Sequence, residues 1–361
     1  MKKRNIAYLA CAAAVIGTGL GAAPPAVGHT VHVVQPGQSI QKAVDAAEPG
    51  DTVLLRRGTY RESVNVSTPG LTLRGMDRGV VIRPGAKPSA KPSAKKAANS
   101  CAANGNGICV VGTKDRRVED VTIASLKVAG FAKNGVYSAR TDHLTVRNVT
   151  AADNGVWGIA QESSVRGVFR WNTARDNGDA GLFLANTVTA EKGAADSRET
   201  MVEHNRLEDN RIGVTVRRLR NLGVVGNHVT GNCAGVFVVG DENKPRAGDL
   251  AVRDNHISRN NAYCPKTERL PFLQGSGIVL TGAEQTLVSG NEISENVGTS
   301  PLSGGIVLFK SMVGVTSERN RISGNWLEGN APADIVNTDT AGKGNTFEGN
   351  SCMASRPAGL C

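Results

Sequence analysis

Aromatic side chains make up only 4% of this chain of 361 residues. After the N-terminal region there is also no apolar stretch of 18 or more residues, which excludes an integral membrane protein built on spanning helices. Intrinsic disorder is excluded as well, because aliphatic residues are plentiful and regularly spaced. No Cys-x-x-Cys pair occurs, so the cysteines do not indicate a structural zinc site.

Glycine and asparagine, by contrast, are abundant, with 43 and 28 residues. Both residue types tolerate left-handed backbone conformations, so they are favoured in turns. The composition therefore predicts short strands separated by many turns.

The N-terminus has the features of a secretory signal peptide over residues 1–28. Lys2, Lys3 and Arg4 precede a short apolar run, and small residues precede His29. A lipoprotein anchored at Cys11 is not favoured, because the residues before it form a poor lipobox. Removal of the peptide lowers the net charge from +10 to +7. These features predict a secreted protein.

Six cysteines remain after that removal, and an even number in an exported chain favours disulfides. Fifteen pairings are open from the sequence alone. We expect the local pairs, because each would close one loop. They are Cys101–Cys109, Cys233–Cys264 and Cys352–Cys361.

A repeat of Asn-x4-Asn pairs extends over the second half of the chain, with a shortest period of 22–23 residues. The first members of the seven pairs are Asn172, Asn205, Asn227, Asn255, Asn291, Asn320 and Asn345. Gly followed by an aliphatic residue recurs shortly after the second Asn, as in Gly181-Leu182 and Gly235-Val236.

This spacing predicts three short strands per repeat, with alternating aliphatic side chains facing inward. If the repeats stack at strand spacing, equivalent Asn side chains lie above one another, and their amides hydrogen-bond along the stack. We expect Asn or Gly at the turn positions that need a positive φ. The sequence thus indicates a solenoid with parallel strands.

The pattern of residues 277–296, with its Gly-Ile start and Asn-x4-Asn end, resembles the repeat of right-handed parallel β-helix proteins of the pectin-lyase-like superfamily. The entry segment 39–60 is also similar to the start of many such proteins, and the resemblance is greatest to secreted actinobacterial members. It implies an all-β fold, a single-stranded right-handed parallel β-helix. A short N-terminal helix that begins after Ser39 would cap the open end.

The resulting organisation has five parts. After the signal peptide, residues 29–83 form the N-terminal cap and first coils, and residues 84–106 form a basic Pro/Ala/Lys loop insertion. Residues 107–350 form the β-helix repeats, and residues 351–361 form a disulfide-closed tail.

In that superfamily, substrates lie along the outside of one parallel sheet, which corresponds here to the strands that begin at Gly-Ile. Charged and aromatic positions on this face concentrate in residues 133–241. Loops at 187–200, 241–249 and 261–275 are expected to wall a groove. The candidate substrate-binding residues are Tyr137, Phe183, Arg211, Phe237 and Asp241.

A polysaccharide lyase or glycoside hydrolase needs groups for proton transfer and for charge neutralisation. Glu162 and Asp179 are the candidate carboxyl groups, although they lie at opposite ends of adjacent strands. Arg217 and Arg218 are the candidates for neutralising a sugar carboxylate. The known active-site motifs of the superfamily do not transfer cleanly. Whether the protein cleaves is therefore open.

The sequence thus predicts binding of an extracellular and acidic polysaccharide or cell-wall polymer, and it leaves open whether the protein cleaves it. The alternative is a non-catalytic surface or adhesion module. We expect no nucleic-acid partner, because aromatic and basic residues do not interleave. The chain is expected to be a monomer.

Metal ions are not expected. His228, His256 and Glu292 would stack in one outward column between Arg206 and Arg321, but a solvated surface ladder is favoured over a metal site. A copper role like that of NosD-type β-helix proteins lacks a Met/His cluster. A need for calcium is left open, although no motif supports a calcium site, and no other cofactor is expected.

Overall fold

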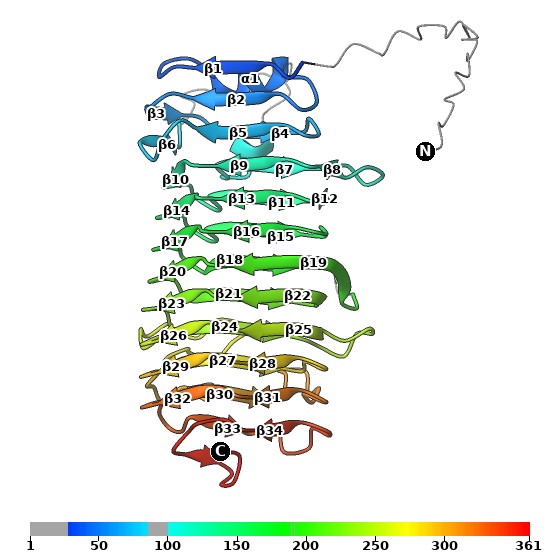
Figure 1. The fold of residues 1–361 in the computed structure, drawn as a ribbon, viewed down its shortest axis with the longest axis vertical. Helices are drawn as coiled ribbons and strands as arrows, with labels where there is room; N and C mark the ends of the chain where they lie inside the picture. Colours follow the sequence, from blue (N-terminus) through cyan, green and yellow to red (C-terminus); the bar gives the residue numbers. More distant parts are fainter. Residues whose placement is uncertain (1–27, 86–99, 189, 191) are drawn as a thin grey trace, which may run out of the picture.

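A computed structural model describes residues 28–85, 100–188, 190 and 192–361, and Figure 1 shows them as a stack of coils. The predicted signal peptide, except for its last residue, and residues 86–99 of the predicted basic loop lie outside the described residues. Within the described part, no helix is both long and apolar enough for a membrane span. Each coil passes through three parallel sheets, called A, B and C, in that order.

The strands of sheet A run in sequence order along the stack. They are β1 (Val31–Val34), β2 (Thr52–Leu55), β5 (Thr72–Gly75), β9 (Thr122–Ala124), β13 (Thr145–Arg147), β16 (Val168–Arg170), β19 (Ala195–Glu203), β22 (Leu219–Val225), β25 (Gly248–Arg253), β28 (Leu287–Ser289), β31 (Arg321–Ser323) and β34 (Thr346–Glu348).

Sheet B follows sheet A in each coil. Its strands are β3 (Gly58–Arg61), β6 (Val80–Arg83), β10 (Lys127–Ala129), β14 (Thr150–Ala152), β17 (Thr173–Arg175), β20 (Arg206–Glu208), β23 (His228–Thr230), β26 (His256–Ser258), β29 (Glu292–Ser294) and β32 (Trp326–Glu328).

Sheet C completes each coil. Its strands are β4 (Val64–Val66), β7 (Ile108–Val111), β11 (Val136–Ala139), β15 (Ile159–Glu162), β18 (Ala180–Ala185), β21 (Ile212–Arg217), β24 (Ala234–Val239), β27 (Ser276–Thr281), β30 (Gly304–Phe309), β33 (Ile335–Asn337) and β35 (Ser355–Arg356). A separate pair consists of β8 (Val118–Glu119) and β12 (Thr141–Asp142). The all-β parallel β-helix that the sequence predicts is confirmed.

The N-terminal end of the stack is covered by helix α1 (Ile40–Ala46), as predicted. Ser39 caps it, since the Ser39 Oγ accepts a hydrogen bond from the Lys42 backbone N–H. Ile40 and Val44 are buried against the first coils, so the helix closes the apolar interior. A second helix, α2 (Ser100–Ala103), precedes β7.

Two apolar clusters lie on opposite faces of sheet C. On β24, Val236 and Val238 point into the interior of the coils and belong to the main core. Phe237, between them, points outward and belongs to a second cluster with Leu273 and Leu302 from neighbouring loops. The outer face of sheet C is therefore covered by loops rather than exposed along its length.

The Asn side chains form two continuous ladders inside the turns. In the first ladder, the Asn205 Nδ2 donates to the Asn227 Oδ1 at 2.9 Å and to the Phe169 carbonyl at 2.9 Å. The Asn205 Oδ1 in turn accepts two bonds from Asn172. Each buried amide is thus satisfied by its neighbours along the stack. The first ladder comprises Asn172, Asn205, Asn227, Asn255, Asn291, Asn325 and Asn350.

The second ladder lies five residues further along each coil and is bonded in the same way. It comprises Asn154, Asn177, Asn210, Asn232, Asn260, Asn296 and Asn330.

The predicted alignment is wrong in the last coils. The sequence pairs Asn320 with Asn291, but the structure stacks Asn325 on Asn291. Asn320 instead starts a short third ladder below Thr286. As a result, Trp326 and not Arg321 continues the predicted histidine column.

The prediction that Asn or Gly takes the turn positions with positive φ holds for Gly, as at Gly226 and Gly290, but not for the ladder Asn. The positive φ falls on the residue before the ladder Asn, and this residue is variously Gly, Asp, Glu, Arg, His or Trp. The ladder Asn is needed for its amide. The Gly of Gly-Ile is needed for space, because a Cβ on Gly158 would lie 2.7 Å from the Gly181 carbonyl oxygen and 2.8 Å from the Asn177 Nδ2.

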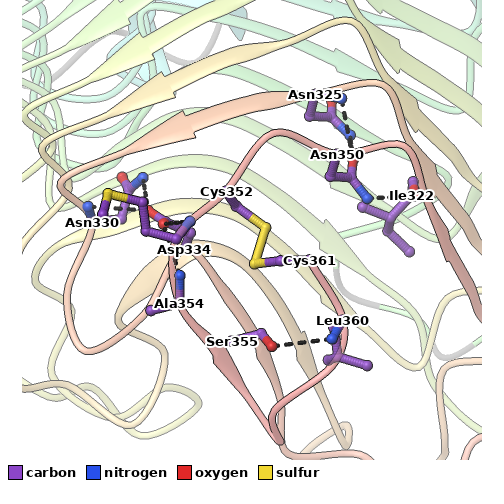
Figure 2. The surroundings of a disulfide bond; sticks show 11 residues. Ile322, Asn325, Asn330, Asp334, Asn350, Cys352, Ala354, Ser355, Leu360 and Cys361 are labelled. Carbon is purple, nitrogen blue, oxygen red and sulfur yellow. Dashed lines mark hydrogen bonds between the residues drawn. A yellow bond between two sulfur atoms is a disulfide. The ribbon is translucent and has the colours of Figure 1, made fainter.

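The three predicted disulfides are present: Cys101–Cys109, Cys233–Cys264 and Cys352–Cys361. Figure 2 shows the last one in the C-terminal tail, close to the end of the second ladder. There the Asp334 carboxylate takes the place of an Asn. It accepts a bond from the Asn330 Nδ2 at 2.9 Å and one from the Met353 backbone N–H at 2.9 Å.

Candidate functional site

A cavity of about 640 Å³ lies outside sheet C over the middle coils. Its floor contains Phe183, Thr215 and Phe237 from β18, β21 and β24. Its walls come from the loops that leave the two edges of the sheet. Seven of the nine predicted site residues line this cavity: Asp179, Phe183, Arg211, Arg217, Arg218, Phe237 and Asp241.

Glu162 and Tyr137, the other two predicted residues, do not line the cavity. The Tyr137 hydroxyl donates to the Glu162 carboxylate at 2.7 Å. The Val188 backbone N–H also donates to that carboxylate at 3.1 Å. Burial and the adjacent Glu162 raise the pKa of Tyr137 far above its usual range, so the hydroxyl stays protonated. The structure therefore does not place Glu162 and Asp179 together.

One end of the cavity is built from the residues that precede three successive strands of sheet C. The Trp157 indole N–H donates to the Asp179 carboxylate at 3.0 Å. The Arg211 Nε lies 4.0 Å from the other oxygen of that carboxylate. Burial raises the pKa of Asp179, while the bond from Trp157 and the charge of Arg211 oppose this shift.

Arg211 connects the sheet to the wall of the cavity. Its Nη1 donates to the Pro265 carbonyl in the loop over residues 259–275 at 2.9 Å. Its Nη2 is buried and has no hydrogen-bond partner among the residues that the structure describes. A buried N–H of a charged group is costly without a partner, so this atom is suited to bind an oxygen of a ligand.

The other end of the cavity carries Arg217, Arg218 and Asp241. Arg218 is almost fully buried and forms an ion pair with Asp241. The Arg217 Nη1 donates to the Val188 carbonyl at 3.1 Å. Because its charge is compensated by Asp241, Arg218 is a less effective neutraliser of a bound carboxylate than the sequence suggests.

The aromatic rings are arranged differently from the expectation. Phe237 is 1% exposed and Phe183 is 7% exposed, so neither ring offers a broad surface to a sugar. Trp157, which the sequence analysis does not select, stacks on Phe183 with ring centroids 4.0 Å apart. It is only half-buried. Its position directly before Gly158-Ile159, at the start of a sheet C strand, is the signal that would have identified it.

The loop that follows β30 is a further wall that the sequence analysis does not select. Met312 and Val313 from this loop line the cavity and are largely exposed. Glu268, Arg269 and Leu270 line it from the predicted loop over residues 261–275.

The histidine column occupies a different surface, along sheet B. His228 and His256 stack with ring centroids 5.0 Å apart. The His256 Nδ1 lies 3.1 Å from the Glu292 carboxylate. In the described part of the chain, no three His, Cys, Asp or Glu side chains come together as a metal site.

Comparisons with known proteins identify the class. Residues 96–249 match the family model described as the right handed beta helix region. Residues 185–356 match the model of the periplasmic copper-binding protein NosD. A search of curated proteins gives no match.

Solved structures of similar fold cover most of the chain. The A-module of Azotobacter vinelandii mannuronan C-5 epimerase AlgE4 has a TM-score of 0.53 and 17% identity, over 86% of this chain and 90% of that chain. DFA-IIIase from Arthrobacter chlorophenolicus A6 without its lid has a TM-score of 0.54 and 13% identity, over 90% of this chain and 92% of that chain. Alginate lyase from Paenibacillus sp. str. FPU-7 has a TM-score of 0.50 and 14% identity, over 91% of this chain and 96% of that chain. The chain is a right-handed parallel β-helix repeat protein. At identities this low, the similarity supports the fold alone and not a shared function.

The residues present do not fit a copper centre of the kind that the NosD model implies. Copper favours His, Cys and Met ligands. The six cysteines of the described part are all in disulfides. The parallel rings of His228 and His256 face each other rather than a shared ion.

Proposed function

We propose that the protein binds an acidic polysaccharide in the cavity outside sheet C. The observation that carries this proposal is the buried, unpartnered Nη2 of Arg211 in the cavity lining of the described chain. A guanidinium N–H with no partner is suited to a carboxylate or sulfate oxygen, because a charge-assisted bond offsets the cost of its burial.

The remainder of the cavity suits a sugar chain. The half-buried Trp157 lines one end of the cavity, and rings of this type stack on the apolar faces of sugars. The floor is apolar, whereas the rim carries Arg217, Glu268 and Arg269. An apolar surface with a few convergent polar groups is typical of a ligand site.

Asp179 supports cleavage as a further step. Its raised pKa makes the protonated carboxyl more available near neutral pH, as a general acid requires. It lies next to Arg211, which would hold the sugar carboxylate. We therefore propose a lyase- or hydrolase-like role in which Asp179 transfers the proton.

A specific observation favours the alternative, a non-catalytic binding module. Glu162, the second predicted carboxyl group, is held by Tyr137 outside the cavity lining. A hydrolase needs two carboxyl groups about 5–10 Å apart. Binding without turnover is the outcome that this alternative predicts.

Export would place the protein beside such polymers. The three disulfides are typical of proteins that fold in oxidising compartments. We propose that residues 1–28 direct this export.

The test is a titration of alginate and polygalacturonate oligomers into the protein by calorimetry, together with a turnover assay for unsaturated products and new reducing ends. We expect Arg211→Gln to weaken binding about tenfold or more, because it removes a charge-assisted bond. Asp179→Asn should abolish turnover and leave binding within about threefold.

Arg259→Gln is the matched control, because Arg259 is an exposed arginine paired with Glu295 outside the cavity. Equal affinities of wild type, Arg211→Gln and Arg259→Gln would contradict binding at this site. Because Arg211 also holds the Pro265 loop, Trp157→Leu provides a second variant that should weaken binding without breaking that contact.

A further inference from the structure

A second hollow, of about 430 Å³, lies at the corner between sheets A and B. In a three-sided coil this corner lies across from sheet C, so the hollow is separate from the cavity described above. Its lining includes Trp171, together with Arg78, Asn148, His204, Arg206 and His228. None of the described residues in this lining is acidic.

Trp171 has an unusual backbone for its type. It occupies the turn position before the ladder Asn172 and has a φ of +55°. The equivalent positions of the two adjacent coils are Asn148 and His204, at +53° each. Asn and His adopt this conformation far more readily than a bulky aromatic residue does. A bulky residue in a sparsely populated backbone conformation motivates the hypothesis of a function for its side chain.

The Trp171 ring is held in place yet remains accessible. The side chain is 50% exposed. The Arg170 guanidinium lies 4.7 Å from the ring centroid, a cation–π contact that orients the indole. The Arg170 Nε is buried and has no hydrogen-bond partner among the described residues. The Arg170 guanidinium is therefore held by its contact with the Trp171 ring.

The surroundings of the ring are cationic and rich in hydrogen-bond donors. Arg78, from the turn between β5 and β6, overhangs the hollow and is exposed. Arg206 lies on the other side, where Glu208 compensates part of its charge. The His204 ring lies against Gly226, where a Cβ would be only 2.7 Å from that ring. The missing Cβ leaves room for His204 beside Trp171.

The hollow extends along the stack. A smaller one of about 120 Å³ adjoins it and shares Arg78, Asn148, Trp171 and Thr173. Successive coils are ~4.8 Å apart, close to the length of one sugar residue. A sugar chain that runs parallel to the axis would therefore place consecutive residues over consecutive coils.

We propose that this corner is a second binding site, which takes an acidic sugar chain with one residue stacked on Trp171 and carboxylates of the chain toward Arg78 and Arg206. Stacking on an exposed indole favours a ring-shaped ligand. The excess of positive charge selects an acidic one. The site stands on its own residues and does not depend on the function of the sheet C cavity.

The test uses an oligogalacturonate hexamer and the matched neutral galactose hexamer. Both are titrated into the Arg211→Gln protein, in which we expect weaker binding at the sheet C cavity. We expect the acidic hexamer to bind and to change the tryptophan fluorescence. Trp171→Asn in the same background should weaken this binding about tenfold or more.

Trp171→Asn is suited to the test because the preceding coil already has Asn148 at this position. The variant should therefore be at least as stable to heat as its parent, which separates lost binding from lost folding. Trp326→Ala is the control, since Trp326 is equally exposed but lies outside the hollow. Arg78→Gln should weaken the acidic hexamer and leave the neutral one unchanged.

Three results would overturn the proposal. The first is an absence of hexamer binding at millimolar concentration. The second is unchanged affinity in Trp171→Asn. The third is equal affinity for the acidic and the neutral hexamer. The change in affinity that Arg211→Gln alone causes tests only the function proposed for the sheet C cavity, and not this second site.

Discussion

The corner between sheets A and B differs from the two edges of sheet C in the length of its connections, although the same repeat builds both. From β9 to β32, the turn between sheets A and B always has two residues, for example Trp171–Asn172 and Gly226–Asn227. The connections at the edges of sheet C range from a single residue after β21 to the long loop over residues 259–275.

The ladders explain this difference. In the first ladder, an interior Asn must lie within hydrogen-bond distance of the Asn in both adjacent coils, so the corner tolerates no change of length in the coils that carry this ladder. Beyond the ladders, the edges of sheet C have no such requirement. Insertions collect there, cover the outer face and build a cavity, whereas the corner can change only through the identity of a side chain.

The largest effect is expected from an insertion. One alanine inserted between Gly226 and Asn227 should destabilise the protein by at least about 4 kcal/mol, because it displaces one rung of the ladder and leaves buried amides unpaired. The same insertion after Lys266, in the loop at the edge of sheet C, should cost less than about 1 kcal/mol. Urea denaturation of both variants measures the contrast, and equal losses would contradict it.

A single substitution within a ladder should have a smaller effect. Asn232 donates to Asn260 and to the Leu207 carbonyl, and its Oδ1 accepts from Asn210. Asn232→Ala should lower the free energy of unfolding by about 3 kcal/mol, since several buried groups lose partners. Asn243→Ala, in a loop at the edge of sheet C, is the control and should change it by less than about 1 kcal/mol.

The smallest effect is expected at Asp179. Because its pKa is raised in the folded protein, the ionised carboxylate lowers stability at neutral pH, and this cost disappears as the pH falls through that pKa. Asp179→Asn should therefore raise the melting temperature at pH 7 by about 1–2 °C, a small shift because the group is partly solvated.

The pH dependence is the check on Asp179. The advantage of Asp179→Asn should shrink as the pH is lowered toward the ordinary range of aspartate. Asp176→Asn, at an exposed carboxylate that pairs with Arg175, is the variant for comparison. An advantage that persists in acid would contradict the assigned cause.

Particular residues show how far the sequence predicts this molecule. The stacking of Asn205 and Asn227 is predicted by their spacing alone. A repeat that buries its face only against its neighbours must place equivalent residues at equivalent positions in successive coils. The strand phase places Phe183 and Phe237 correctly on the outer face of sheet C. It does not predict their burial, because the covering loops do not belong to the repeat.

The misassigned ladder has a similar cause. Asn291, Asn296, Asn320 and Asn325 satisfy two alignments equally well in sequence, and only the lengths of the intervening loops select one. The Val188 N–H that binds Glu162 and the Asp241 carboxylate that pairs with Arg218 were hidden for a related reason, since both lie in loops that follow sheet C strands. Local spacing predicts the scaffold, whereas the site depends on loops whose paths no period describes.

The carboxylate of Asp334 gives the second ladder a direction. From Asn154 to Asn330, every amide accepts from the coil before it and donates to the coil after it, so the amide dipoles all point the same way. The positive end of this line meets a negative charge that collects N–H groups from three residues. A duplicated coil could enter anywhere upstream and find both a donor and an acceptor. Downstream of Asp334 it would meet only an acceptor, so the second ladder can lengthen from within but not beyond this carboxylate.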